Sequence, residues 1–456
     1  MIKKNDEYIV DIVDDGFEGE GIAKINNFTI FVKGAIKGEK IKVLILKVNS
    51  SYAFAKIIEI LEKSEDRVEP DCISYKRCGG CDLRHIKYEK TLDIKRNKVQ
   101  SLVNKTLETK LQVEETIGME NPFNYRNKAQ YPVGVNKNGE LVFGVFANRT
   151  HEIIETTNCK IQTEISEEIS KFIISFMKEN GIKPYNEETR SGTIRHIIIK
   201  VGIKTNEIMC ILVVNNKKLE HQEILVQDLI KHFPNIKTIV KNINNKNTNV
   251  ILGNENEVLY GDGYIYDNLG EFKFKISPMS FYQINPMQTE KLYNTAIEKA
   301  KLTKADTIFD LYCGIGTIGI FASKYVKQVY GIEIVEQAIK DANENAQINN
   351  VKNAEFMVGD VEFALSELLE KRNIKPDVVF LDPPRRGLDE TTIKNLKKVK
   401  PKKIIYISCN PATLIRDLKM LEGIYEIGSI TPVDMFPWTK HVETIALLVK
   451  SRDSEY

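Results

Sequence analysis

The sequence predicts a multidomain protein in three parts: a small N-terminal β-barrel (residues 1–60), a central α+β domain (61–270) and a C-terminal α/β domain (271–456). Three observations support this. A chain of 456 residues exceeds one ordinary domain. Short strand-like runs fill the first part, and strands alternate with amphipathic helices in the last. The middle part shows both patterns.

The first part contains short alternating strands, beginning with E-Y-I-V-D-I-V from Glu7 and ending with A-F-A-K-I-I-E-I-L from Ala53. Turn pairs such as Asp15-Gly16 and Lys37-Gly38 separate them. Several short strands at such intervals are typical of a small, closed or half-closed, OB-like barrel.

The middle part carries helical periodicity over residues 85–107 and 164–180. Strand patterns occur over residues 140–146, 194–202 and 207–214. No clean repeat is visible, so we expect an α+β domain.

The last part alternates strands with helices. The expected strands are 307–314, 328–334, 354–360, 376–384, 403–411 and 441–449. This alternation predicts βαβ units and a parallel, doubly wound sheet. Such sheets bind ligands beyond the carboxyl ends of their strands.

Composition excludes several classes of protein. Hydrophobic residues make up 42% and charged residues 28%, as in soluble globular proteins. The net charge of +2 does not by itself indicate a nucleic-acid partner. The N-terminus has no signal-peptide pattern, and no apolar run approaches the ~18 residues of a membrane span. We therefore expect a cytoplasmic protein without a membrane partner.

The first strand of the last part runs into a glycine-rich turn. Asp310 is followed by Gly314, Gly316 and Gly319, which let the backbone turn tightly and approach a ligand closely. An acid about twenty residues further on, here Glu333, suits the ribose hydroxyls of a nucleotide-like cofactor. NAD and S-adenosylmethionine both fit this pattern.

Two features favour S-adenosylmethionine. Asp310 would repel a pyrophosphate but suit a sulfonium and an ammonium group. Asp382-Pro383-Pro384 ends the fourth strand and resembles the (Asn/Asp)-Pro-Pro-x tetrad of base-modifying methyltransferases. The alternative is a simple strand terminator in which Asp382 caps the next helix.

Cys409 ends the fifth strand, within Ser408-Cys409-Asn410-Pro411. Its position before a helix that Pro411 would open favours a nucleophile, because a helix N-terminus lowers the usual thiol pKa of about 8.5. The alternative is a small buried hydrophobic residue, although the flanking polar residues make poor core neighbours.

A thiolate is needed when a methyl group must be added to carbon 5 of uracil. Addition of sulfur to carbon 6 gives an enolate whose carbon 5 is nucleophilic. A base must afterwards remove the carbon 5 proton so that sulfur can leave. His441 and Glu443 would point to one face of the last strand, and either side chain suits this role.

Five motifs, in order, carry a family resemblance. They are F-Y-Q-I-N (281–285), D-L-Y-C-G-I-G (310–316), D-P-P-R-R-G (382–387), S-C-N-P (408–411) and H-V-E-T (441–444). Together they resemble the uracil-C5 RNA methyltransferases, including the 23S ribosomal RNA 5-methyluridine enzymes, over nearly the whole chain. The N-terminal barrel, with G-E-G-I-A and V-K-G-A-I-K-G-E, resembles a TRAM domain.

The resemblance implies a Rossmann-like catalytic domain that uses S-adenosylmethionine, with Cys409 as nucleophile and Glu443 as base. It implies donor contacts from Gln283, Tyr312, Gly314, Glu333, Asp360 and Asp382. Tyr312 replaces a Phe found in some members, and either ring can pack on the donor.

Cys72, Cys78 and Cys81 form a C-x5-C-x2-C pattern, and Cys159 is the candidate fourth ligand. In a chain without a secretion signal, such spacing indicates metal binding rather than disulfides. The sequence alone favours zinc. The family resemblance implies instead a [4Fe-4S] cluster.

RNA is the expected partner. Arg126 in the Y-R-N-K run and Arg385 are candidate RNA contacts. Lysine- and arginine-rich stretches at 84–98 and 394–403 suit phosphate binding, although each also fits a solvated helix face. The target uracil must leave its stack to reach Cys409.

Three functions remain open: methylation of 23S ribosomal RNA, the same chemistry on a tRNA uridine, and a non-catalytic RNA-binding assembly factor. The resemblance favours the first, because a TRAM domain with four cysteines accompanies ribosomal members. An exocyclic N-methyltransferase would leave Cys409 unused. We expect a monomer without an obligate protein partner.

Overall fold

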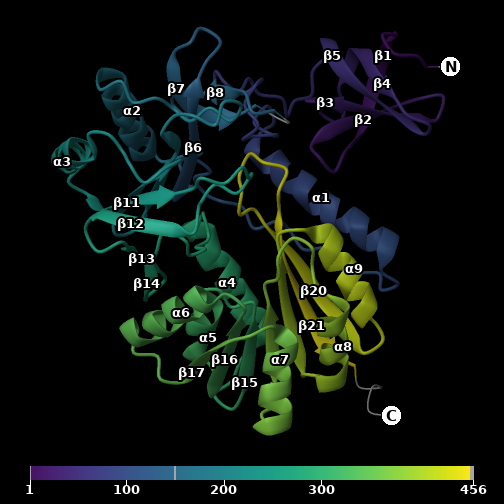
Figure 1. Cartoon of the computed structure of the whole chain (residues 1–456). Helices are drawn as coiled ribbons and strands as arrows, with labels where there is room; N and C mark the ends of the chain where they lie inside the picture. Colours follow the sequence, from purple (N-terminus) through teal and green to yellow (C-terminus); the bar gives the residue numbers. More distant parts are fainter. Residues whose placement is uncertain (1, 148–149, 452–456) are drawn as a thin grey trace.

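The computed structural model describes residues 2–147 and 150–451 (Figure 1). In the view of Figure 1, a barrel (purple) and a central α/β unit (blue to teal) lie above a large C-terminal domain (green to yellow). Within the described ranges no helix is long and apolar enough to cross a bilayer.

The barrel is closed, with the strand order β1-β2-β3-β5-β4. Its strands are β1 (Glu7–Asp15), β2 (Glu20–Ile25), β3 (Phe28–Lys33), β4 (Lys40–Val48) and β5 (Tyr52–Glu62). Alternate residues such as Ile30, Val32, Ile41 and Val43 are fully buried inside it. The predicted N-terminal barrel is confirmed.

The central unit is built on a seven-stranded sheet of order β12-β11-β10-β9-β6-β7-β8. Its strands are β6 (Lys128–Val135), β7 (Leu141–Phe146), β8 (Ile153–Glu155), β9 (Ile194–Val201), β10 (Ile208–Val214), β11 (Ile236–Ile243) and β12 (Glu255–Tyr260). Helices α2 (Glu164–Glu179) and α3 (Gln222–His232) pack on this sheet. Ile169, Ile173 and Ile199 belong to the resulting core.

Two elements of the middle region pack on the C-terminal domain. Helix α1 (Tyr88–Thr106) lies against α9 (Pro411–Leu421), with Val99 and Val103 in the same core as Leu418 (Figure 1). The hairpin of β13 (Ile265–Leu269) and β14 (Phe272–Ile276) packs on other C-terminal helices.

The C-terminal sheet has the order β17-β16-β15-β18-β19-β21-β20. Its strands are β15 (Thr307–Leu311), β16 (Gln328–Glu333), β17 (Ala354–Val358), β18 (Val378–Leu381), β19 (Lys403–Ser408), β20 (Tyr425–Val433) and β21 (Glu443–Lys450). The remaining helices are α4 (Pro286–Ala300), α5 (Thr317–Ser323), α6 (Glu336–Ile348), α7 (Val361–Ser366), a π-helix (Glu367–Lys371) and α8 (Glu390–Val399).

The sheet corrects one prediction. Strands β15 to β19 are parallel, but β21 runs antiparallel to both β19 and β20, so the sheet is mixed rather than wholly parallel. Strand β20 was not expected from the sequence. The short connection from β20 to β21 is compatible with an antiparallel pair, since parallel neighbours need a long crossover.

Candidate active site

A cavity of about 750 Å³ opens at the carboxyl ends of the parallel strands. Its lining includes nine of the ten residues predicted for catalysis, donor binding and RNA contact: Gln283, Tyr312, Gly314, Glu333, Asp360, Asp382, Arg385, Cys409 and Glu443. The tenth, Arg126, lies outside its described lining. Residues from five strand ends and a loop before α4 thus converge on one space.

The glycine-rich turn between β15 and α5 shapes one wall. Tyr312, Gly314 and Gly316 have φ values of 65°, 55° and 79°, so the backbone is left-handed at alternate positions. The Gly314 N–H donates to Glu333 Oε2 at 3.3 Å. A Cβ on Gly316 would lie 2.8 Å from the Phe356 ring, so the turn requires glycine there.

Asp310 does not act as the sequence argument supposed. Its side chain is fully buried beneath the turn, and Oδ2 accepts a 2.8 Å hydrogen bond from the Gly319 N–H. Burial raises the pKa of Asp310 to about 8. It holds the turn from below, so it provides no electrostatic argument for one cofactor over another.

Cys409 follows β19 and precedes α9, as predicted. Asn410 caps this helix, accepting from the Ala412 N–H at 3.2 Å, and Pro411 is its first residue. The Asn410 amide also donates to the Arg385 main-chain oxygen at 3.0 Å, which ties the Asp-Pro-Pro loop to the cysteine.

The thiol of Cys409 is not acidified in this state. Burial raises its pKa, the Glu443 carboxylate raises it further, and the Arg385 guanidinium beside it acts in the opposite direction. The sequence argument considered the helix N-terminus but not the buried acid next to the sulfur. A thiolate therefore requires the neighbouring acids to be neutral or the cation to be close.

Glu443 is the first residue of β21 and is only 2% exposed. The antiparallel register pairs Ser408 with Thr444, which sets Glu443 next to the end of β19. Burial and the charge of Asp382 raise the pKa of Glu443, and burial raises the pKa of Asp382 to about 7. Two neighbouring enclosed carboxyls cannot both ionise easily, so one of the pair holds a proton near neutral pH.

His441, the alternative base, lies before β21 rather than in it and outside the described lining of the cavity. Burial and the Arg385 charge lower the pKa of His441 to about 4. Of the two side chains that the sequence left open, the structure brings Glu443 to Cys409.

The loop that carries Gln283 is held by the central sheet. The Asn127 side-chain amide donates to the Gln283 main-chain oxygen at 2.8 Å, and the Asn127 N–H donates to the Ile284 oxygen at 2.9 Å. Nearby, the buried Lys200 ammonium donates to the oxygens of Ser277 and Ser280. The central unit therefore fixes one wall of a cavity in the C-terminal domain.

Two aromatic residues of the lining were missed. Phe281 is 63% exposed, and Phe436 lies in the loop between β20 and β21. Exposed rings at the mouth of a cavity suit stacking on a flat ligand. Phe281 stands in the F-Y-Q-I-N motif, but nothing in the sequence distinguished its exposed ring from that of Tyr282, which is only 7% exposed and belongs to the core.

Cys72, Cys78, Cys81 and Cys159 gather near one another as free thiols, each half-buried. Burial raises the pKa of Cys81, and the other three cysteines raise it further. A buried group of thiols of this kind suits a metal, because a cation would stabilise the thiolates. However, the described residues contain no set of three or more His, Cys, Asp or Glu side chains arranged as metal ligands.

Two family models match the chain. The model described as tRNA (uracil-5-)-methyltransferase matches residues 87–451, and the TRAM domain model matches residues 3–58. The second match coincides with the closed barrel.

Relatives cover the chain from end to end. An uncharacterized RNA methyltransferase of Clostridium acetobutylicum is 48% identical over 98% of both chains, and one of Staphylococcus epidermidis is 44% identical over 99% of both. A solved tRNA (uracil-54, C5)-methyltransferase of Pyrococcus abyssi, in complex with S-adenosyl-L-homocysteine, has a TM-score of 0.76 and 28% identity, covering 97% of this chain and 99% of that one.

The family match extends over the cavity, its glycine-rich turn and both domains that frame it. The relatives share the same length and carry RNA-methyltransferase names. This chain therefore belongs to the tRNA (uracil-5-)-methyltransferase family and is an S-adenosylmethionine-dependent RNA (uracil-5)-methyltransferase with an N-terminal TRAM domain.

Proposed function

We propose that this enzyme methylates carbon 5 of a uridine in 23S ribosomal RNA through a temporary bond from Cys409 to carbon 6. The observation that carries the proposal is the convergence of Cys409, Glu443 and Asp382 in one cavity with the glycine-rich turn. This reaction requires a nucleophile, a base and a surface that binds the methyl donor.

The order of events follows from the electrostatics. The Cys409 thiol loses its proton to water, the nearby Arg385 cation stabilises the thiolate, and the sulfur adds to carbon 6 and leaves negative charge on the ring. When bound, S-adenosylmethionine supplies an electrophilic methyl group for carbon 5. The Glu443 carboxylate then removes the carbon 5 proton, and the electron pair of that bond restores the ring double bond as sulfur leaves. With the proton of the pair on Asp382, Glu443 is ionised, and its raised pKa makes it a stronger base.

We propose that Gln283, Tyr312, Gly314, Glu333, Asp360 and Asp382 hold the methyl donor. The carboxylate of Glu333 is oriented by the Gly314 and Val335 N–H groups, which leaves it directed along the cavity wall. Arg385 and Arg126 are proposed RNA contacts.

Ribosomal RNA is proposed because of the barrel and the four cysteines, which the family resemblance associates with ribosomal members. A tRNA uridine is the second candidate. The matching family model and the Pyrococcus abyssi structure carry tRNA names, and that structure covers 97% of this chain, so a barrel alone does not exclude tRNA. Cytoplasm is the proposed location, where either RNA is found.

Mapping 5-methyluridine tests this proposal. Ribosomal RNA and tRNA from cells with and without the gene are digested and compared by mass spectrometry. Loss from 23S RNA only supports the first candidate, and loss from tRNA only supports the second. Unchanged 5-methyluridine in both RNAs would leave the non-catalytic role as the explanation.

We also propose that Cys72, Cys78, Cys81 and Cys159 hold a [4Fe-4S] cluster. The proposal is supported by the neighbouring cysteines, which contribute to the raised pKa of Cys78, Cys81 and Cys159. Protein purified without oxygen should be brown and contain about four irons per chain. Replacing Cys159 with Ser should remove the colour, whereas Cys210→Ser, in the apolar core, should keep it. A colourless protein with stoichiometric zinc would decide for zinc.

A further inference from the structure

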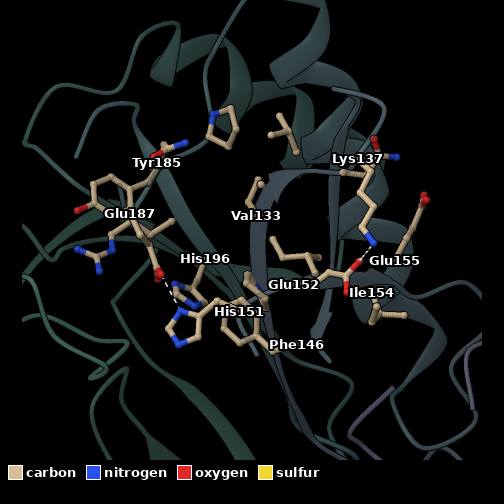
Figure 2. A pocket seen from close by; sticks show the side chains of 18 of the residues that line it. Val133, Lys137, Phe146, His151, Glu152, Ile154, Glu155, Tyr185, Glu187 and His196 are labelled. Carbon is tan, nitrogen blue, oxygen red and sulfur yellow. Dashed lines mark hydrogen bonds and ion pairs between the residues drawn. The ribbon is translucent and has the colours of Figure 1, made fainter. Parts of the chain in front are cut away.

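The central unit contains a second cavity, of about 1010 Å³ (Figure 2). Its lining comes from the end of β6, the β6–β7 hairpin, β8, the segment 183–192 and the start of β9. Its described lining has no residue in common with that of the active site. The reaction described above makes no use of it.

Flat side chains lie at two places in this cavity (Figure 2). The Phe146 ring stacks on His151 with centroids 5.2 Å apart and planes 28° from parallel. The Tyr185 ring lies 4.3 Å from the Arg195 guanidinium carbon. Arg195 is buried and donates to the Asn244 oxygen at 2.8 Å, so it holds the tyrosine ring in place. Fixed rings at a cavity suit stacking on a planar ligand.

The charges of the cavity are largely neutralised. Glu152 accepts from Arg77 at 2.7 Å. It also faces the Lys137 ammonium at 3.1 Å, and Glu187 is hydrogen-bonded to His151 at 2.6 Å (Figure 2). Such pairing provides little net attraction for phosphate. Recognition by stacking and by neutral hydrogen bonds therefore fits the cavity better than recognition by charge.

One neutral hydrogen-bonding group is free. His196 lies in the cavity, and its Nδ1 atom is buried with no partner among the described residues. Burial lowers the pKa of His196 to about 4, so the ring is uncharged at neutral pH. A buried polar atom without a partner is costly unless a ligand or water satisfies it. A heterocyclic ring edge would do so.

Strand β6 connects the two cavities. Asn127, just before this strand, holds the Gln283 loop of the active site, and Pro132 to Val135 line the second cavity. At ~3.3 Å per residue, Asn127 and Gly134 are about 23 Å apart along the strand. When the target uridine of an RNA lies in the active-site cavity, other nucleotides of the same RNA are close enough to reach the second cavity.

We propose that the second cavity binds an unpaired nucleobase of the substrate RNA, outside the stem-loop that carries the methylated uridine. Phe146 and Tyr185 supply the stacking surfaces, and His196 contacts the base edge. The inference rests on the proposed function for the choice of RNA. It predicts that RNA flanking the target contributes to binding without affecting chemistry.

The test uses the RNA that 5-methyluridine mapping identifies and measures binding rather than methylation, so its failure is distinguishable from a failure of the proposed function. Fluorescence anisotropy gives Kd for a substrate RNA fragment and for the same RNA trimmed to the target stem-loop. Phe146→Ala and Tyr185→Ala should each weaken binding of the longer RNA about tenfold, as expected for one lost stacking contact. Binding of the trimmed RNA and kcat should not change.

Two variants serve as controls. Phe172, in α2, packs its ring on His232 and lies outside the described lining of both cavities. The Phe172→Ala variant should therefore bind both RNAs normally. Tyr185→Phe keeps the stacking surface and should bind like the unmodified protein. Thermal melting confirms that each variant is folded.

Equal Kd values for the longer RNA across folded Phe146→Ala, Tyr185→Ala and unmodified protein would overturn the proposal. A photoreactive base in the flanking RNA should crosslink to peptides from residues 133–155 or 183–196. Crosslinks confined to other peptides would also overturn it, as would a cavity that binds a protein partner and leaves RNA affinity unaffected.

Discussion

The side-chain amide of Asn127 donates a 2.8 Å hydrogen bond to the main-chain oxygen of Gln283, joining the central sheet to the wall of the active site. Asn127 is only 4% exposed, and its own N–H holds the next residue of the same loop. If Gln283 binds the methyl donor as proposed, donor binding in one domain depends on a side chain in another.

Asn127→Ala should raise KM for S-adenosylmethionine about three- to tenfold, the range of about 1 kcal/mol for one buried hydrogen bond. The change loosens the Gln283 loop but leaves Cys409 in place, so kcat should fall less than twofold. Asn180→Ala, which removes a bond to the Phe176 oxygen at the end of α2, is the matched control. Equal KM values for the two variants would contradict the role of Asn127.

Cys409→Ala should abolish the covalent trapping of RNA that contains 5-fluorouridine. Unmodified enzyme with methyl donor should form an adduct that survives denaturation, because fluorine cannot leave as a proton does. Denaturing gel electrophoresis measures the adduct. Methyl transfer at a normal rate by Cys409→Ala would refute the covalent mechanism.

Glu443→Gln should separate methyl transfer from product release. The amide cannot accept the carbon 5 proton, so the variant should transfer methyl once and accumulate an adduct with natural uridine RNA. His441→Gln should turn over nearly normally, because His441 lies outside the described lining of the cavity. Single-turnover and steady-state rates, measured together, distinguish the two bases.

The reactivity of Cys409 should increase with pH beyond 9. Burial and Glu443 raise the pKa of this thiol, so its thiolate fraction is still increasing where an ordinary cysteine has levelled off. Mass spectrometry of the Cys409 peptide after iodoacetamide treatment gives the rate. Arg385→Gln removes the opposing cation and should shift the profile to higher pH, whereas Arg386→Gln should not.

Asp310→Asn should make stability less sensitive to alkaline pH. The folded-state pKa of about 8 exceeds the unfolded value of ~3.9, so this group stabilises the fold fully below pH ~4 and loses that contribution as pH rises through 8. The Tm of Asp310→Asn, relative to that of the unmodified protein, should therefore rise from pH 5 to pH 8. Asp262→Asn, at an exposed position, should show a constant difference.

Much of the fold could be predicted from local signals. Turn pairs between short alternating runs predicted the barrel, and glycines after a strand predicted the turn at Gly314, since few other residues adopt its φ. Pro411 predicted a helix after Cys409, and that helix begins there, with Asn410 as a cap that was not predicted. Each of these features is determined by residues that lie close together in the sequence.

The remaining features depend on contacts between distant segments. The hydrophobic pattern of β21 did not reveal its direction, because this antiparallel strand is buried on both faces and forms a continuous apolar run like its parallel neighbours. The burial of Asp310 and the effect of Glu443 on Cys409 depend on which strands become neighbours. Asn127 carried no motif that would connect it to Gln283.

The antiparallel pairing of Ser408 with Thr444 also constrains how such an enzyme can evolve. Side chains alternate along a strand, so slipping β21 by one residue would turn Glu443, the proposed base, away from the sulfur. The segment before β21 can gain or lose residues only if that alignment survives. An insertion between the last two strands would displace Asp434, Met435 and Trp438, which are buried there, so this connection must keep its length as the final strand keeps its alignment.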